Sequence, residues 1–194
     1  MDPAESWMLT HYHHKSQKPL QSLSALTDRE ALKIMTALGE KEGEVYRRFK
    51  QPQKYLQLRK KTEAWLRQEF VRKGGQPTTP YPHYFSLGPA PWIEEGYNSQ
   101  SKAIYVPLSA FRPEHISFTY PDSMVSCSLR NKQDKVFYQA DYHGQVFTLE
   151  EILQIISTFG MPGEAWRTDA TRKHDLFIEA QVWREASSIM LVCK

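Results

Sequence analysis

Apolar residues recur at helical spacing in two segments of the N-terminal part of the chain. In the first, Thr27 and Glu30 fit a capping box, and apolar residues follow every three or four positions until Gly39. In the second, Pro52 stands at a favourable first helical position and two glycines follow residue 73. The pattern therefore predicts one helix from the capping box to Gly39 and a second, amphipathic helix over about residues 52–73.

After residue 75 the helical pattern gives way to alternation between apolar and polar positions, interrupted by prolines and polar turns. A short strand near the N-terminus, over residues 7–13, has the same character. The segment Pro121-Asp122-Ser123 is typical of a turn between two strands. Several short strands in succession favour a mainly antiparallel sheet. The candidates after the prolines are residues 84–87, 102–108, 116–120, 125–129, 136–139 and 145–147.

The C-terminal part adds a helix and two further apolar segments. Thr148 and Glu151 fit a second capping box, followed by an apolar-periodic segment that Gly160 closes. Residues 176–183 and 188–193 fit a final hairpin, and a helix over 177–190 is the competing interpretation. The predicted fold class is α+β: two N-terminal helices, a mainly antiparallel sheet, one further helix and a C-terminal β-hairpin.

Length and composition fit a single domain. The chain has 194 residues, of which 40% are hydrophobic and 24% are charged, as in ordinary globular proteins. One domain over 1–194 is expected, with a possible helical subdomain at 21–75 and a sheet-based remainder at 76–194. The longest apolar run, residues 189–193, is too short to cross a membrane, and no secretory signal is visible, so a cytoplasmic protein is expected. Two cysteines form neither a disulfide framework nor a zinc site.

The net charge of +3 hides an uneven distribution. Residues 1–75 carry 15 lysines and arginines against 9 acidic residues, and many of the cations fall on one arc of the 52–73 helix. That arc is either a solvated helix face or an anion-binding surface for nucleic acid, with Lys60, Lys61 and Arg67 as candidate contacts. No nucleic-acid motif accompanies it. On the apolar arc, Arg59 and Glu63 are four residues apart and are predicted to pair.

Two short strings could carry chemistry, although the chain lacks the common nucleotide-loop, dinucleotide, hydrolase and metalloprotease motifs. The first is His11-Tyr12-His13-His14, in which a strand would place His11 and His13 on one face. These imidazoles are candidate catalytic or ligand-binding groups. A metal site completed by His143 or Glu179 is the least favoured use, and no metal ligand is predicted.

The second string is Glu179-Ala180-Gln181-Val182-Trp183. On a strand, Phe177, Glu179, Gln181 and Trp183 share one face, which sets a carboxyl and an amide between two aromatic rings. Such a face suits a planar polar ligand, because the rings stack on it and the polar groups contact its edges. An amphipathic hairpin half covered by loops is the alternative interpretation.

Together the two strings resemble the His-Tyr-Glu arrangement of ADP-ribosyltransferases. The candidate trio is His11 or His13, Tyr105 or Tyr84, and Glu179, and Tyr105 is the preferred catalytic tyrosine. The resemblance implies that NAD is the substrate. It further implies that the imidazole holds a ribose hydroxyl, the tyrosine stacks on nicotinamide, and the glutamate stabilises an oxocarbenium-like transition state.

Three functional classes follow from these patterns. The first is a small-ligand or nucleotide-binding protein, including a transferase of the kind just described. The second is a nucleic-acid or anion binder that uses the basic helix, and the third is an interaction protein with neither site. The first class requires His11 or His13 to share a concave pocket with Glu179. No pattern in the chain specifies an oligomeric state.

Overall fold

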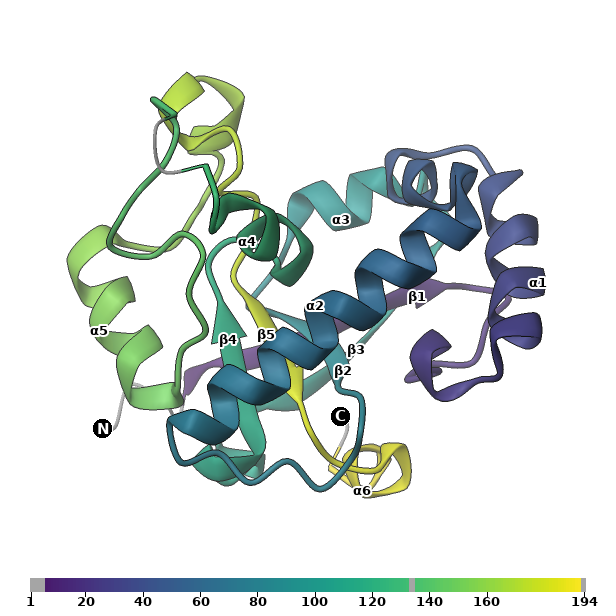
Figure 1. Ribbon diagram of the computed structural model, residues 1–194, viewed down its shortest axis with the longest axis horizontal. Coiled ribbons are helices and arrows are strands. Elements are labelled where there is room, and N and C mark those ends of the chain that lie inside the picture. Colours follow the sequence, from purple (N-terminus) through teal and green to yellow (C-terminus); the bar gives the residue numbers. More distant parts are fainter. Residues whose placement is uncertain (1–5, 133–134, 193–194) are drawn as a thin grey trace.

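Five antiparallel strands form one sheet in the order β3-β1-β2-β5-β4 (Figure 1). The structure is a computed structural model that describes residues 6–132 and 135–192. Strands β1, β2 and β5 are adjacent in the middle of the sheet although β5 comes from the end of the chain. The strands are β1 (Met8–His14), β2 (His83–Leu87), β3 (Ser101–Pro107), β4 (Ile116–Thr119) and β5 (Glu179–Val182).

The described residues also form six α-helices, which together with the sheet confirm the α+β class. They are α1 (Asp28–Gly39), α2 (Pro52–Arg72), α3 (Pro91–Gly96), α4 (Ser123–Leu129), α5 (Leu149–Phe159) and α6 (Ala186–Met190). Both predicted capping boxes are present: the hydroxyl oxygens of Thr27 and Thr148 accept from the backbone N–H three residues on, and a glutamate reaches back. Within the described residues, no helix combines the length and the apolar character needed to cross a membrane.

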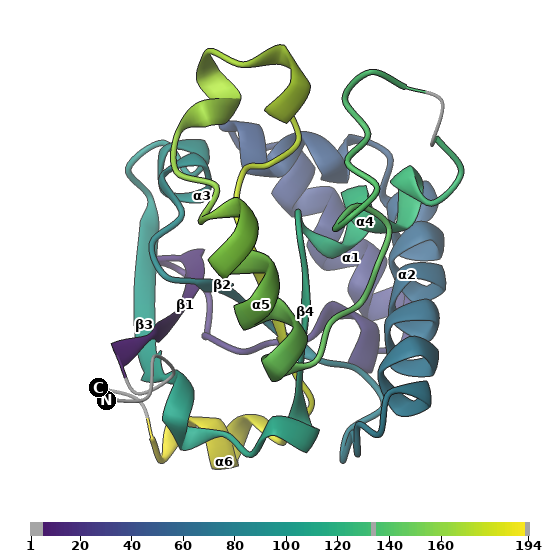
Figure 2. The same ribbon diagram turned by 90° about the vertical axis from the view of Figure 1, so that its left-hand side faces the viewer.

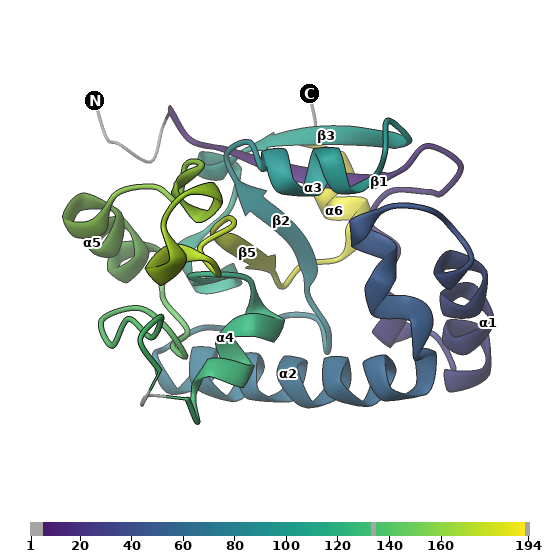
Figure 3. The same ribbon diagram turned by 90° about the horizontal axis from the view of Figure 1, so that it is seen from above.

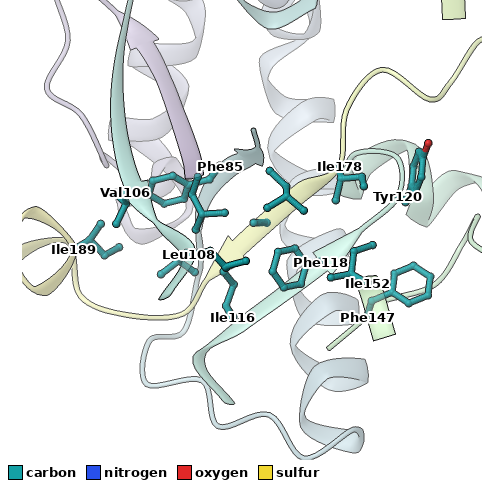
Figure 4. Packing of buried hydrophobic residues seen from close by; sticks show 14 of the residues in the cluster. Phe85, Val106, Leu108, Ile116, Phe118, Tyr120, Phe147, Ile152, Ile178 and Ile189 are labelled. Atoms are coloured by element: carbon teal, nitrogen blue, oxygen red, sulfur yellow. The ribbon is translucent and has the colours of Figure 1, made fainter. Parts of the chain in front are cut away.

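The two faces of the sheet differ in chemistry. One face is apolar, and α5 and α6 close it through Ile152 and Ile189, neither of which is exposed. Figure 4 shows this packing, with Ile152 close to Phe118 and Phe147. Figure 2 shows α5 lying across this side of the sheet. Burial of these side chains is the main source of stability for the sheet.

The opposite face is unusually polar for a buried surface. It carries Thr10, Ser86, Ser117, Thr119, Glu179 and Gln181. Helix α2 runs along this side, as Figure 3 shows, and contributes Trp65 and Phe70 to a cluster with Trp183. Beyond the sheet, α1 packs on α2 and on the 3₁₀ helix Glu44–Lys50 in a second apolar cluster. A sheet face with hydroxyl, carboxyl and amide groups beneath a helix is suited to a polar site.

The predicted strand 125–129 is wrong, because these residues belong to α4. The Asp122 side chain, expected in a plain turn, caps this helix and accepts from the N–H groups of Met124 and Val125 (3.1 and 3.2 Å). Buried residues then recur at helical spacing, at Ser123, Ser126 and Leu129. Aspartate is common both in turns and at helix N-caps. In this chain Asp122 is an N-cap, and the residues after it are helical instead of extended.

The C-terminal hairpin is also wrong in its second arm. Strand β5 confirms the first arm, whereas residues 186–190 form α6, which inserts Ile189 into the apolar core. The competing helix over 177–190 is wrong for its first half. Residues 136–139 form no strand, and residues 145–147 contribute only an isolated bridge from Phe147 to Phe118. The edge of β4 is therefore covered mainly by irregular chain.

Candidate functional site

A cavity of about 540 Å³ opens beside the polar face of the sheet. Strands β1 and β2 and the start of β5 line one side of it. The 3₁₀ helix Glu44–Lys50 and parts of α1, α2, α3 and α4 line the other. Its volume is typical of small-molecule sites in proteins. Four of the predicted site residues line this cavity: His11, His13, Phe177 and Glu179.

Glu179 meets a second carboxyl group in the cavity wall. Asp122 lies beside it, and Glu179 Oε1 accepts from the Ser123 N–H (3.2 Å) and from Gln181 Nε2 (3.1 Å). Burial, and after it the neighbouring Asp122 carboxylate, raises the pKa of Glu179 to about 7. Burial also raises the pKa of Asp122. The wall therefore holds a carboxyl group that exchanges its proton near neutral pH.

This raised pKa predicts a pH dependence of stability that Glu179→Gln removes. The folded state binds the Glu179 proton more tightly than the unfolded chain, so stability due to this group is complete below pH 4.5 and is lost towards pH 7. Each unit of pKa difference corresponds to about 1.4 kcal/mol. The free energy of unfolding of Glu179→Gln, relative to the native chain, should therefore rise between pH 4.5 and 7 in urea titrations. A difference that stays constant over this range would contradict the raised pKa.

His11 is held by the backbone on both ring nitrogens. Its Nε2 accepts from the Leu20 N–H (3.1 Å), so Nδ1 carries the proton and donates to the Tyr84 carbonyl (2.8 Å). Burial lowers the pKa of His11 to about 4, so the ring is neutral at physiological pH. Strands β1 and β2 pair only through two residues each, and the His11 side chain bridges them beyond that point. Its first role is therefore to join these strands.

The His13 imidazole makes fewer hydrogen bonds than the His11 imidazole. Its ring stacks on that of His11 with centroids 6.0 Å apart, and its Nδ1 lies 3.1 Å from the His14 carbonyl. Nδ1 is then the donor, and Nε2 has no hydrogen-bond partner among the described residues. A neutral Nε2 accepts hydrogen bonds. By strand alternation, both imidazoles leave β1 on the side opposite to Glu179, and they reach the cavity where β1 and β2 separate.

Tyr84 of β2 lies on the same sheet face as Glu179 and also lines the cavity. Its hydroxyl donates to Glu63 Oε1 (2.9 Å), and the Arg59 guanidinium covers one face of its ring at 4.8 Å. The predicted pair of Arg59 and Glu63 is confirmed, with Arg59 Nε 3.0 Å from Glu63 Oε1. This trio, together with packing against the cluster of Trp65, Phe70 and Trp183, fixes the position of the Tyr84 ring in the cavity wall.

Three further lining residues were not recognised in the sequence as site residues. Arg48 has an exposed side chain that lines the cavity, and its Nε donates to the Val45 carbonyl (2.7 Å). The hydroxyls of Tyr46 and Ser22 are buried without a hydrogen-bond partner among the described residues. Burial raises the pKa of Tyr46 to about 12, so its hydroxyl stays protonated and able to donate. Unpaired buried polar groups are uncommon and mark places where a ligand or water binds.

The other predicted residues lie outside the cavity. Tyr105 is 49% exposed on the edge strand β3. Gln181 and Trp183 are buried against β4: the Gln181 Oε1 and the Trp183 Nε1 both contact the Ser117 hydroxyl, at 2.9 Å each. Their hydrogen-bonding groups are used within the sheet. Of the two candidate tyrosines, Tyr84 and not Tyr105 therefore lines the cavity with the imidazoles and Glu179.

The basic residues proposed for anion binding lie on the outer side of α2. Lys60 pairs with Asp28, whereas Lys61 and Arg67 are exposed. His143, considered above as a third metal ligand, lies in a separate buried network in which its Nε2 donates to Asp175 Oδ1 (2.9 Å). Across the described part of the chain, no three His, Cys, Asp or Glu side chains gather closely enough to hold a metal ion.

Comparison with protein-family models, with curated proteins and with solved structures finds no match to this chain.

Proposed function

We propose that the chain binds a nucleotide in this cavity and acts on it as a transferase of the ADP-ribosyltransferase kind. One observation carries the proposal: a histidine, a tyrosine and a glutamate from the three adjacent strands β1, β2 and β5 line the same cavity. The residues are His13 with His11, Tyr84, and Glu179. The resemblance noted in the sequence requires these three residue types to meet at one ligand.

The walls suit the two chemical parts of a nucleotide. Aromatic side chains that line the cavity include Tyr12, Trp92 and Phe177, and the rings of Trp92 and Phe177 are stacked with centroids 6.3 Å apart. Flat apolar surfaces of this kind bind heterocyclic rings. Arg48 interacts with the Tyr55 hydroxyl and the Asp122 carboxylate but makes no close ion pair among the described residues, so its guanidinium is the candidate contact for a phosphate group.

The proposed reaction uses the trio in distinct roles. His13 Nε2 accepts from a ribose hydroxyl, and the part of Tyr84 that lines the cavity supports the nicotinamide ring. The bond from ribose C1′ to the nicotinamide nitrogen breaks, and nicotinamide leaves with the electron pair. An acceptor nucleophile then bonds to C1′ and releases its proton to solvent. The ionised carboxylate of Glu179 stabilises the positive charge that develops on the ribose ring.

A thermal-shift titration tests ligand binding without assuming the reaction. NAD, ADP-ribose, AMP and adenosine are added at rising concentrations to the native chain, to Arg48→Met and to the control Arg29→Met, whose arginine is exposed on α1. The melting temperature should rise with NAD and ADP-ribose concentration, because a ligand that binds only the folded state stabilises it by mass action. Arg48→Met should weaken the response to NAD and ADP-ribose more than the response to adenosine.

A melting temperature that stays unchanged for every compound at millimolar concentration would remove nucleotide binding. The interaction-protein interpretation would then account better for the chain. Equal responses of Arg48→Met and Arg29→Met would show that the bound compound does not use the phosphate contact proposed here.

A further inference from the structure

A second hollow lies at the C-terminal end of α2, whereas the ligand cavity contacts the first half of this helix. It has a volume of about 250 Å³ and lies between the last turns of α2 and the turn at residues 144–146. We call it the Arg130 groove. The side chains that line it are mostly polar, and three of them are basic: Arg72, Lys73 and Arg130. Glu69 is the one acidic residue among its lining residues.

The three cations differ in whether they form an ion pair. Arg72 pairs with Glu69 (2.7 Å), and Lys73 pairs with Glu151 (2.8 Å). Arg130 is exposed, makes no ion pair among the described residues, and places its guanidinium 5.0 Å from the centre of the Trp65 ring. A cation–π contact with an aromatic ring holds a guanidinium in place without using up its N–H groups as hydrogen-bond donors. Within residues 6–132 and 135–192, Arg130 is therefore a positioned cation without an anionic partner.

Backbone donors lie next to this cation. The N–H groups of Gly144, Gln145 and Val146 donate to no acceptor among the described residues. Gly144 has a φ of +73°, and a Cβ there would lie 3.1 Å from the Arg130 Cα, so the turn packs directly on Arg130. Successive free N–H groups around a left-handed residue form an anion-binding concavity. The groove thus combines a free guanidinium with free amides.

A line of cations leads along α2 to the groove. Lys54, Lys61 and Arg72 all have exposed side chains, and at 100° per residue they project within roughly 20° of one another. Lys61 and Arg72 are separated by roughly 16 Å along the helix axis at 1.5 Å per residue. Cations spaced along one line fit the repeated charges of a phosphodiester backbone better than the single charge of a small anion.

We infer that the Arg130 groove binds a phosphate group of a single-stranded polynucleotide, with Lys61 and Lys54 contacting further phosphates along α2. This surface is separate from the ligand cavity and does not depend on the function proposed for it. The contacts are to phosphates and not to base edges, so binding is independent of base sequence. It also weakens as salt rises, because each contact releases counterions.

Fluorescence anisotropy with a labelled, mixed-sequence 20-nucleotide single-stranded RNA tests this inference. The native chain is compared with Arg130→Gln, Lys61→Gln and the control Arg29→Gln over a range of salt concentrations. Each lost phosphate contact should reduce the slope of log K against log salt by roughly 0.7. Arg130→Gln and Lys61→Gln should each show this reduction together with weaker binding, and Arg29→Gln should match the native chain. Circular dichroism and melting temperature establish that each variant is folded.

Two results would overturn the inference. One is absence of RNA binding by the folded native chain at low salt, or an equal loss in Arg130→Gln and Arg29→Gln. The other comes from a parallel titration with inorganic phosphate. If Arg130→Gln abolishes phosphate binding and leaves RNA binding unchanged, the groove is a small-anion site and the polynucleotide assignment is wrong.

Discussion

Replacing Glu63 with alanine is expected to lower the free energy of unfolding by about 3–5 kcal/mol. The Glu63 side chain is only 1% exposed, and its Oε1 accepts from both the Arg59 Nε and the Tyr84 hydroxyl. The substitution leaves the buried guanidinium and the buried phenol without their shared acceptor. The cost is that of an uncompensated buried charge, which far exceeds the contribution of an ion pair in water. Urea unfolding at pH 7 measures it.

A surface pair gives the matched control. Glu44 pairs with Arg47, and these side chains are 48% and 73% exposed. Glu44→Ala should cost less than about 1 kcal/mol, because water screens an exposed pair. The double variant Arg59→Met/Glu63→Leu should recover much of the loss, since it removes both charges. Equal costs for Glu63→Ala and Glu44→Ala would show that the Arg59–Glu63 pair is not buried as described.

The second large effect is expected in catalysis and rests on the proposed function. Glu179→Gln keeps the shape of the side chain and removes its negative charge. Loss of one preorganised electrostatic contact to the transition state typically costs about 10²–10³ in turnover. We expect nicotinamide release from NAD to slow by this factor in Glu179→Gln while NAD still binds. Chromatographic measurement of nicotinamide at saturating NAD gives the rate.

The pH profile separates a catalytic carboxylate from a structural one. Because the pKa of Glu179 is about 7, turnover by the native chain should rise as pH increases through neutrality, as the carboxylate ionises. Glu179→Gln should lose this rise. Glu150→Gln, an exposed residue of α5, should behave as the native chain. Native turnover by Glu179→Gln would exclude Glu179 from the reaction.

Local patterns predicted most of the elements. Capping boxes and apolar periodicity located α1, α2 and α5, and alternation located the five strands. Helix spacing also predicted the Arg59–Glu63 pair. The errors at α4 and α6 have one cause: short segments of about five to seven residues satisfy helix and strand patterns equally well. The helix forms in each case because Asp122 caps α4 and because Ile189 of α6 packs in the core. Both contacts depend on the tertiary structure.

The site was predictable only in part, because its assembly depends on strand order. The sequence marked the imidazoles and Glu179, but spacing alone could not choose between Tyr84 and Tyr105. The choice follows from β2 pairing with β5 while β3 takes the sheet edge. Arg48 lies between the two predicted N-terminal helices, and no local signal indicates that it lines a cavity. Long-range pairing of this kind is not encoded in residue spacing.

A crystal structure of the chain with NAD bound tests the central claim most directly. The account predicts electron density for the dinucleotide in the cavity, with the nicotinamide ring against Tyr84, a ribose next to Glu179 and His13, and the phosphates towards Arg48. Density for NAD elsewhere on the surface, or an empty cavity at saturating NAD, would contradict it.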